Sequence, residues 1–455
     1  MKKYAFFCFL IVFGVSSAAF GQTSAVFNAK LYVGNGITMW GTGDIGSQIN
    51  NAYASSSCPS TGCVIHVITG QYSFSTTIIG THGVSGKPVL IECDPGTGTN
   101  FANSGHTTQL TYTGSGTAVN ISIGTTGSGM VGCGLYGPGT ATATIGLLVG
   151  GSSSSNGTGV LQHFDYNDIA NFGTGLEFGY NVYVTHFEGN DIHDNGTATL
   201  GHNVYMPSGV TGTGENIHFH GGAITNKSSF FSTSCLEIDN PTDISFSNIS
   251  FDQCGATFNA VNVFANLTDN HWENPNGATA SPFLTVGPAS NFVTLNIRDK
   301  EWLEDTAGTG RTEFIKIAPN GPNAGITVNI EGGVFVPAEN VQQLLNSTGA
   351  GCCAVATVSG IENGFGGSVF TNLVGGSWFE IWAPRLKASG TVALAGGGAT
   401  VSGISPQFSN GSSFNCIGND LTTGTNPVKV FPASPSSITV VGIGSDTISY
   451  ICSGH

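Results

Sequence analysis

The chain has 455 residues and a formal net charge of −15, with 9% charged residues, 40% hydrophobic residues and 68 glycines. This hydrophobic content is too high for a chain that is disordered for lack of apolar residues. The acidic balance disfavours nucleic acid and anionic lipid surfaces as partners, because no basic stripe is present to neutralise phosphates.

The N-terminus predicts a bacterial secretory signal peptide. Lys2 and Lys3 precede an apolar run over residues 5–15 and small residues over 16–19. The run is too short to span a bilayer as a helix, and no later apolar stretch is long enough. We therefore expect cleavage near residue 21, a mature chain that is secreted or held at the cell surface, and no membrane insertion.

The first structural element that the sequence predicts is a short helix over residues 44–56. Asp44 is a favoured N-cap, and Ile45, Ile49, Ala52 and Tyr53 fall on one face at helical spacing. Strand-like segments follow over 64–68 and 74–79. A helix followed by strands is suited to cover the open end of a stack of strands, whose edges would otherwise template aggregation.

The central part of the chain carries a motif that recurs without a fixed period. His163–Ile169 (HFDYNDI) returns 23 residues later as His186–Ile192 (HFEGNDI). Looser copies follow at intervals of 21 to 33 residues. The equivalent apolar anchors are Ile169, Ile192, Ile224, Phe251, Trp272, Trp302 and Phe335. Such spacing indicates a solenoid, in which residues of one alignment column become neighbours in space.

Beyond residue 389 the pattern changes to short strands separated by frequent turns, as in Thr391–Leu394 and Ser437–Val441. This pattern predicts a small β-sandwich-like domain. The expected organisation is therefore a signal peptide (1–21), an N-terminal cap with the first rungs (22–84), a parallel β-helix (85–388) and a C-terminal β domain (389–455).

Ten cysteines remain once Cys8 leaves with the signal peptide, and an even number in an exported chain suggests disulfides. Cys58 and Cys63 are the favoured pair because they bracket a short Pro-Ser-Thr-Gly loop. Other pairs are plausible, although the sequence alone leaves connectivity open: Cys93–Cys133, Cys235–Cys254 and Cys416–Cys452. No cysteine pair has the spacing typical of zinc ligands.

Several N-terminal positions resemble a known motif. Asp44, Gln48, Ile49 and Ala52, followed by an apolar strand and Gly70-Gln71-Tyr72, are similar to the start of pectate-lyase-like right-handed parallel β-helix proteins. The stretch 214–224 resembles a rung of the phage tailspikes in that superfamily, whereas Ile68 stands where the family often has proline. The resemblance covers roughly residues 40–380. It implies an all-β fold and leaves the chemistry open, because the superfamily hosts lyases, hydrolases and tailspikes.

The solenoid alignment places one group of candidate site residues beside the anchors. Asp252 and Glu273 fall in adjacent rungs, so their carboxylates would lie on the order of 5 Å apart. Paired carboxylates serve glycoside hydrolysis as an acid and a nucleophile or base. We predict that Asp252, Glu273 and Glu301 are catalytic and that His193 and His271 contact substrate. The alternative is that these acids satisfy turn backbone.

A second column follows half a rung later, through Glu177, Tyr205, Glu237, Thr285 and Lys316. Glu177 and Glu237 would lie two rungs apart, roughly 9–10 Å, with Tyr205 between them. We predict that both glutamates are catalytic and that Tyr205 and Lys316 contact substrate. An ordinary solvated face is the alternative.

These columns favour an exported protein that binds and hydrolyses a polysaccharide, with Trp378 as a sugar-stacking platform. Two alternatives stay open: a lyase acting on a uronate polymer, and a non-catalytic glycan-binding or structural protein of the tailspike type. The histidines recur with the rungs and are interpreted as strand residues, so we expect no metal and no cofactor, except Ca²⁺ in the case of a lyase. The tailspike resemblance also leaves a homotrimer open.

Overall fold

A computed structural model describes most of the chain. The described residues are 27, 29–79, 86–94, 106–121, 127–155, 159–197, 201–226, 235–260, 262–273, 282–287, 292–303, 313–318, 325–336, 343–347, 354–359, 362–363, 371–373, 378–380, 386–404, 414–424 and 426–454. The expected signal peptide lies outside them. Within these ranges, no helix has the length and apolar character needed to cross a membrane.

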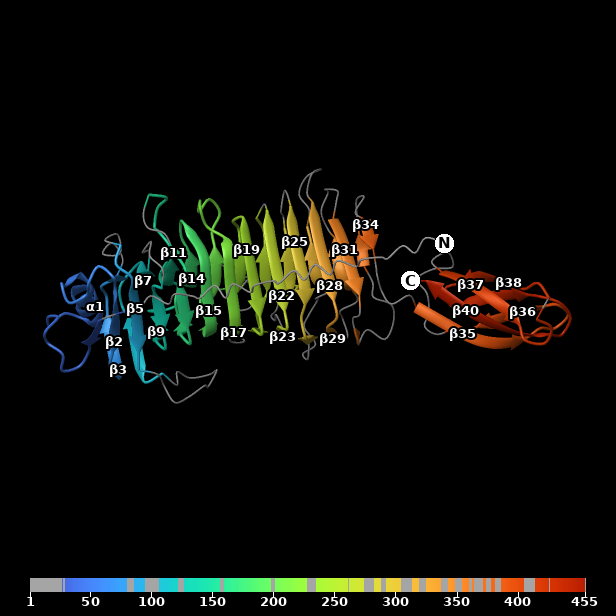
Figure 1. Cartoon of the computed structure of the whole chain (residues 1–455), viewed down its shortest axis with the longest axis horizontal. Helices are drawn as coiled ribbons and strands as arrows, with labels where there is room; N and C mark the ends of the chain where they lie inside the picture. Colours follow the sequence, from blue (N-terminus) through green and yellow to red (C-terminus); the bar gives the residue numbers. More distant parts are fainter. Residues whose placement is uncertain are drawn as a thin grey trace, which may run out of the picture.

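The long central part is a right-handed parallel β-helix, in which successive turns of chain stack along one axis (Figure 1). Each turn contributes strands to three faces. The first face contains β1 (Lys30–Val33), β2 (Cys63–Val67), β5 (Val89–Cys93), β8 (Gly129–Val131), β11 (Gly159–Val160), β12 (His163–Asp165), β19 (Thr242–Ser247), β22 (Val263–Thr268), β25 (Val293–Arg298), β28 (Ile326–Glu331), β31 (Ala354–Ser359) and β34 (Trp378–Glu380).

The second face carries the strands that hold the anchor residues. It contains β3 (Gly70–Phe74), β6 (Thr108–Tyr112), β9 (Gly134–Tyr136), β13 (Asp168–Ala170), β20 (Ser250–Asp252), β23 (His271–Glu273), β26 (Glu301–Leu303), β29 (Val334–Val336) and β32 (Glu362–Asn363). Two long strands, β15 (Val182–His193) and β17 (Glu215–Thr225), run through both the first and the second face. Gly189 in β15 and Gly222 in β17 have φ values of 60° and 84°, a left-handed conformation that suits glycine and lets the strand change face.

The third face is a separate sheet. It contains β4 (Ile78–Ile79), β7 (Thr117–Ile121), β10 (Ile145–Val149), β14 (Thr174–Phe178), β16 (Val204–Met206), β18 (Leu236–Ile238), β21 (Ala256–Phe258), β24 (Leu284–Val286), β27 (Glu313–Ile317), β30 (Gln343–Ser347) and β33 (Thr371–Leu373).

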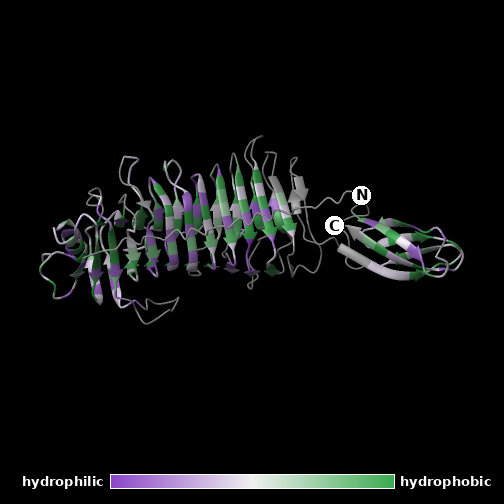
Figure 2. Cartoon of the chain, in the orientation of Figure 1, coloured by the Kyte–Doolittle hydropathy of each residue, from purple (hydrophilic) through white to green (hydrophobic). Residues whose placement is uncertain are grey.

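The register confirms the repeat that the sequence indicates. His163 lies opposite His186, and Ile169 lies opposite Ile192. The anchors point into the solenoid, where Trp272 stacks on Phe251 and Trp302 at ring-centroid distances of 4.1 and 4.8 Å. Along the strands, hydrophobic and hydrophilic residues alternate (Figure 2). Each inward residue is therefore flanked by outward ones, which places the polar residues beside the anchors on the surface.

The asparagine of the repeated motif holds the corner between two faces. Asn190 is buried and donates its side-chain amide to the carbonyl of Phe164 at 2.7 Å, while its own side-chain oxygen accepts from the backbone of Asn167 at 2.9 Å. These bonds satisfy backbone groups that leave the strand ladder at the turn. The motif is thus explained by packing and corner formation.

The N-terminal cap is the predicted helix, α1 (Ile45–Ala54), whose C-cap residue is Ser55. Asp44 caps it by accepting from the Ser47 amide at 2.8 Å, and its other oxygen accepts from the Ser75 amide at 2.8 Å. Burial disfavours the charge of Asp44, but these hydrogen bonds outweigh that effect and lower its pKa to about 2. Asp44 therefore ties the helix to the end of the solenoid.

The C-terminal unit consists of two antiparallel sheets, as the prediction of a sandwich-like domain requires. One sheet contains β35 (Leu386–Ala393), β37 (Phe414–Asp420) and β40 (Thr447–Gly454), and the other contains β36 (Gly398–Ser402), β38 (Lys429–Ser434) and β39 (Ser437–Val441). Residues from both sheets share one core that includes Phe414, Ile438 and Ile448.

Disulfides join the four cysteine pairs that the sequence made plausible. They are Cys58–Cys63, Cys93–Cys133, Cys235–Cys254 and Cys416–Cys452. The first closes the loop after α1, and the last joins β37 to β40. Covalent links of this kind limit the freedom of the unfolded chain.

Candidate functional site

A cluster of acids and histidines lies on the outside of the second face. We call it the second-face cluster; its residues are Asp168, Asp191, His193, Asp194, Asp252, His271, Glu273 and Glu301. The register confirms the predicted columns, because Asp252 pairs with Glu273, and His271 pairs with Ser250 and Glu301. The cluster has two parts, each centred on one histidine.

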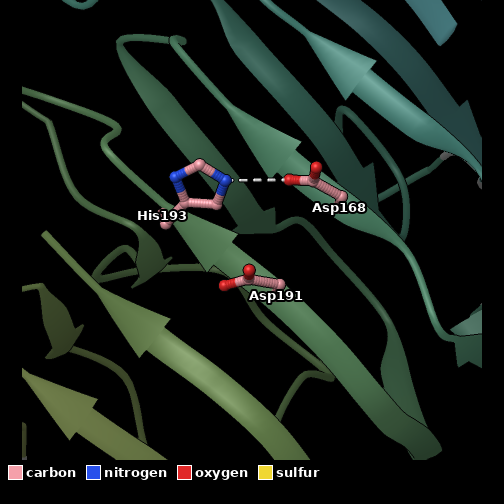
Figure 3. Close-up of side chains that lie close together, drawn as sticks. All are labelled: Asp168, Asp191 and His193. Atoms are coloured by element: carbon pink, nitrogen blue, oxygen red, sulfur yellow. Dashed lines mark hydrogen bonds and ion pairs between the residues drawn. The ribbon is translucent and has the colours of Figure 1, made fainter. Parts of the chain in front are cut away.

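The first part is centred on His193, which contacts carboxylates through both ring nitrogens. Figure 3 shows its contact with Asp168. Nε2 lies 2.9 Å from Asp168 Oδ1, and Nδ1 lies 2.9 Å from Asp194 Oδ2. Burial opposes a charged imidazole, but the hydrogen bonds to these carboxylates outweigh it and raise the pKa of His193 to about 10. The raised pKa favours the imidazolium form of His193 at neutral pH, and both of its ring nitrogens already contact carboxylates.

Asp191 stands beside this pair in Figure 3 without a bond to either partner. Its Oδ1 is buried and has no hydrogen-bond partner among the described residues. Burial is the main cause that raises the pKa of Asp191 to about 7, although nearby His193 acts in the opposite direction. Asp191 is not among the site residues that the sequence predicts, although the register places it in one column with His271 and Glu301. Its shared column with His271 and Glu301 was the available signal.

The second part of the cluster surrounds His271. Its Nδ1 lies 2.7 Å from Glu301 Oε1, whereas its Nε2 lies 3.3 Å from Glu273 Oε2 and 3.8 Å from Asp252 Oδ1. The Ser250 hydroxyl donates to Asp252 Oδ1 at 2.8 Å. The structure thus brings together three of the five acids that we predict to be catalytic, Asp252, Glu273 and Glu301. They share one histidine, and their side chains are 39 to 42% exposed.

The third face carries the other predicted column, with one correction. Glu177 pairs with Tyr205, Tyr205 pairs with Glu237, and Glu237 pairs with Thr257, which precedes Thr285. The sequence alignment passed over β21, because Ala256-Thr257-Phe258 carries a small residue where the other copies have a large apolar one. Lys316 consequently lies three strands from Glu237 instead of two.

Around Glu237 the third face forms a compact group, which we call the third-face cluster: Glu177, His202, Tyr205, Glu237 and Asp239. His202 Nε2 lies 3.4 Å from Glu237 Oε2, and the Tyr205 hydroxyl lies 3.4 Å from Asp239 Oδ2. The rings of His202 and Tyr205 lie 4.7 Å apart between their centroids. The two glutamates therefore flank an aromatic platform on the outside of the β-helix.

Both glutamates of this cluster hold a proton more tightly than usual. Burial raises the pKa of Glu177 to about 7. Burial, together with the neighbouring Asp239 carboxylate, raises the pKa of Glu237 to about 7. Burial also raises the pKa of Tyr205 to about 12, so its phenol stays protonated and serves as a hydrogen-bond donor at neutral pH. Perturbed carboxyl pKa values of this kind are frequent at catalytic sites.

Two predicted substrate contacts lie away from these clusters. Lys316 is half-buried on β27, three strands beyond Glu237. Trp378 begins β34 on the first face, and its side chain lies outside the described part of the structure.

No protein-family model and no curated protein sequence matches the chain. Solved structures do resemble it. The tailspike gp61 of Pseudomonas phage phi297 superposes with a TM-score of 0.52 at 9% identity, over 90% of this chain and 91% of that one. ORF18 of Geobacillus virus E2 superposes with a TM-score of 0.48 at 16% identity, over 91% of this chain and 76% of that one.

The gp54 tailspike of Acinetobacter baumannii bacteriophage AP22, solved in complex with a capsular saccharide of A. baumannii, gives a TM-score of 0.41 at 9% identity over 86% and 68% of the two chains. At such identities the likeness to the phi297 tailspike establishes the architecture and leaves the chemistry to the site. The chain is a parallel β-helix protein that shares its fold with phage tailspikes.

Proposed function

We propose that the chain binds a polysaccharide along the outside of its β-helix and hydrolyses it at the third-face cluster. The observation that carries this proposal is the pair Glu177 and Glu237, which stand in one outward column and both have a pKa of about 7. At neutral pH such a pair is populated with one group protonated and one ionised. That combination is what glycoside hydrolysis requires.

The spacing of the pair favours an inverting reaction. Two strand spacings separate Glu177 from Glu237, which is about 9.6 Å between backbones. Inverting enzymes hold their carboxyl groups about 6.5–9.5 Å apart, so that a water fits between the base and the sugar. Glu237 is assigned as the acid that protonates the leaving oxygen, because Asp239 beside it favours its protonated form. Glu177 is then the base that takes a proton from water.

The surroundings of the pair suit a sugar ring. Tyr205 and His202 form an aromatic platform between the two carboxyl groups, and the Tyr205 phenol supplies a donor for a sugar hydroxyl. The Glu237 side chain is 25% exposed, so a substrate reaches it from solvent. A stack of parallel strands extends this face in both directions, which matches an extended chain substrate.

A panel of polysaccharides that includes uronate polymers tests the proposal. New reducing ends are measured for the wild type, Glu237→Gln and Glu177→Gln, with Glu331→Gln as the control. Glu331 is 62% exposed on the first face and pairs with Arg298. We expect each third-face variant to lose at least about 100-fold in rate while still binding the polymer, and the control to retain its rate.

Other outcomes separate the alternatives. Absorbance of unsaturated sugar ends would show a lyase. Binding without cleavage by the wild type would show a glycan-binding protein. Wild-type rates in both glutamate variants would refute the third-face assignment.

Export and assembly form part of the same proposal. The signal-like N-terminus supports a secreted or surface-held protein, which N-terminal sequencing of the mature protein tests. A homotrimer, in keeping with the tailspike-type fold, is tested by light scattering.

A further inference from the structure

We propose that the second-face cluster binds a divalent transition-metal ion of the Zn²⁺ type through Asp252, His271 and Glu273, with Glu301 holding His271 in place. This site lies on a different face from the third-face cluster and does not depend on the proposed hydrolysis. It also departs from the sequence-based expectation that no metal is bound.

The three donors meet because of strand register. Asp252 and Glu273 occupy the same position in neighbouring strands, and His271 lies two residues before Glu273, so its side chain points to the same side of β23. One donor atom from each of the three residues lies within 4.8 Å of the other two. A parallel stack therefore assembles the set without any long loop.

The distances fit shared coordination better than direct hydrogen bonding. His271 Nε2 is 3.3 Å from Glu273 Oε2 and 3.8 Å from Asp252 Oδ1, which is long for a charged N–H···O bond. Ligand atoms bound to one ion at about 2.0–2.2 Å lie about 3–3.5 Å from each other. A small movement of either carboxylate brings all three donors to that separation.

Glu301 and Ser250 complete the support of the donors. Glu301 Oε1 lies 2.7 Å from His271 Nδ1. When Nδ1 carries the proton and Glu301 accepts it, the lone pair of Nε2 points toward Asp252 and Glu273, which lie 3.8 and 3.3 Å away. A carboxylate behind a histidine ligand is the usual arrangement at metal sites, since it sets the tautomer and strengthens the ligand. The Ser250 hydroxyl orients Asp252 in the same way.

The donor set selects the kind of ion. One imidazole with two carboxylates suits Zn²⁺ or Mn²⁺, whereas Ca²⁺ takes six to eight oxygen ligands. The side chains of Asp252 and Glu273 are each 39% exposed, so water retains access to the ion. By contrast, the neighbouring His193 has carboxylates at 2.9 Å on both nitrogens and is only 15% exposed, which leaves it no free lone pair for a metal.

Competition with a chromophoric zinc chelator at pH 7.5 tests the site on the full-length protein after removal of bound metal. We expect one Zn²⁺ per chain for the wild type and loss of this binding in His271→Gln. Glu301→Gln should weaken binding about 10- to 100-fold, because Glu301 acts through His271. His220→Gln is the matched control: His220 also pairs with a carboxylate, Glu188, at 2.9 Å, but lies on the first face.

Circular dichroism establishes whether each variant is folded. If His271→Gln does not fold, Asp252→Asn serves as the second ligand variant. Absence of Zn²⁺ binding by the wild type would refute the site and identify His271 as an imidazolium held by three carboxylates. An equal loss of Zn²⁺ binding in His220→Gln would show that binding is not specific to the second-face cluster and would refute the site. Displacement of Zn²⁺ by a similar concentration of Ca²⁺ would refute its selectivity for a transition metal. Glu237→Gln should bind Zn²⁺ like the wild type, so failure of the metal site and failure of the proposed hydrolysis remain distinguishable.

Discussion

Replacement of Glu177 by glutamine should make the protein more stable in alkaline solution and leave its stability unchanged in acid. Burial raises the pKa of this carboxyl from 4.5 to about 7, and burial is the cause of the shift. In the unfolded chain Glu177 ionises near its ordinary pKa, whereas in the folded chain it keeps its proton until about pH 7. The folded state therefore loses stability as the pH rises from about 4.5 to 7.

The size of the effect follows from the shift. Each pKa unit corresponds to about 1.36 kcal/mol, so a shift from 4.5 to about 7 gives about 3.4 kcal/mol. Residual contact with solvent reduces this value. We therefore expect Glu177→Gln to raise the free energy of unfolding by about 2–3 kcal/mol more at pH 8.5 than at pH 5. Glutamine has nearly the same shape and does not ionise, so packing should not change.

Urea unfolding at the two pH values measures this difference. Because a solenoid can unfold in parts, hydrogen exchange of the amides in Thr174–Phe178 should accompany it. The exposed control Glu331→Gln should show the same effect at both pH values. If Glu177→Gln changes stability equally at pH 5 and pH 8.5, Glu177 does not have the raised pKa on which its assignment as the base rests, and that assignment fails. A variant that is stabilised and inactive would identify Glu177 as a functional residue.

Four further results are expected. The rate of hydrolysis should follow a bell-shaped pH profile centred near pH 7, since Glu177 and Glu237 both titrate there, and a maximum below pH 5 would contradict the pair. Asp44→Ala should destabilise the cap by about 1–2 kcal/mol at pH 7. The wild type should lose this contribution as the pH falls from about 4 through 2, because Asp44 is then protonated. Coinciding unfolding curves of the wild type and Asp44→Ala at pH 7 would contradict this role. Trp272→Ala should lower the free energy of unfolding by about 3–5 kcal/mol, because the indole is fully buried between two aromatic rings. A loss below 1 kcal/mol, measured by urea unfolding, would refute the stabilising role of this stack. Cys93→Ser with Cys133→Ser should lower stability by about 2–4 kcal/mol because the bond closes a 40-residue separation, whereas unchanged thermal unfolding would show that the bond contributes nothing.

Much of the architecture could be predicted because a parallel stack translates sequence repetition directly into spatial order. The two copies of the histidine motif, at His163 and His186, lie opposite each other in the structure. The pairing of Asp252 with Glu273 followed from the same alignment. Where a copy lacks the apolar signature, as in β21 around Thr257, the alignment failed and Lys316 was placed one strand too near to Glu237.

The site could be predicted only in part. Sequence columns indicated which acids share a face, but ionisation depends on solvent exclusion and on neighbours from other turns. Asp191 illustrates the limit: burial leaves its Oδ1 without a hydrogen-bond partner among the described residues and raises its pKa, although nearby His193 lowers it, and no pattern of spacing reveals this burial. The engagement of His193 by Asp168 and Asp194 likewise depends on side-chain packing.

The class of fold, the capping helix, the inward anchors and the outward columns could be read from the sequence, because they follow from local periodicity and from the regular spacing of stacked strands. The folded structure was needed to show which carboxyl groups are buried with a raised pKa, and how closely carboxylates approach the two nitrogens of His193 and of His271. Those properties depend on a few ångströms of side-chain placement and on the loss of water around each charge, and neither quantity is encoded in spacing.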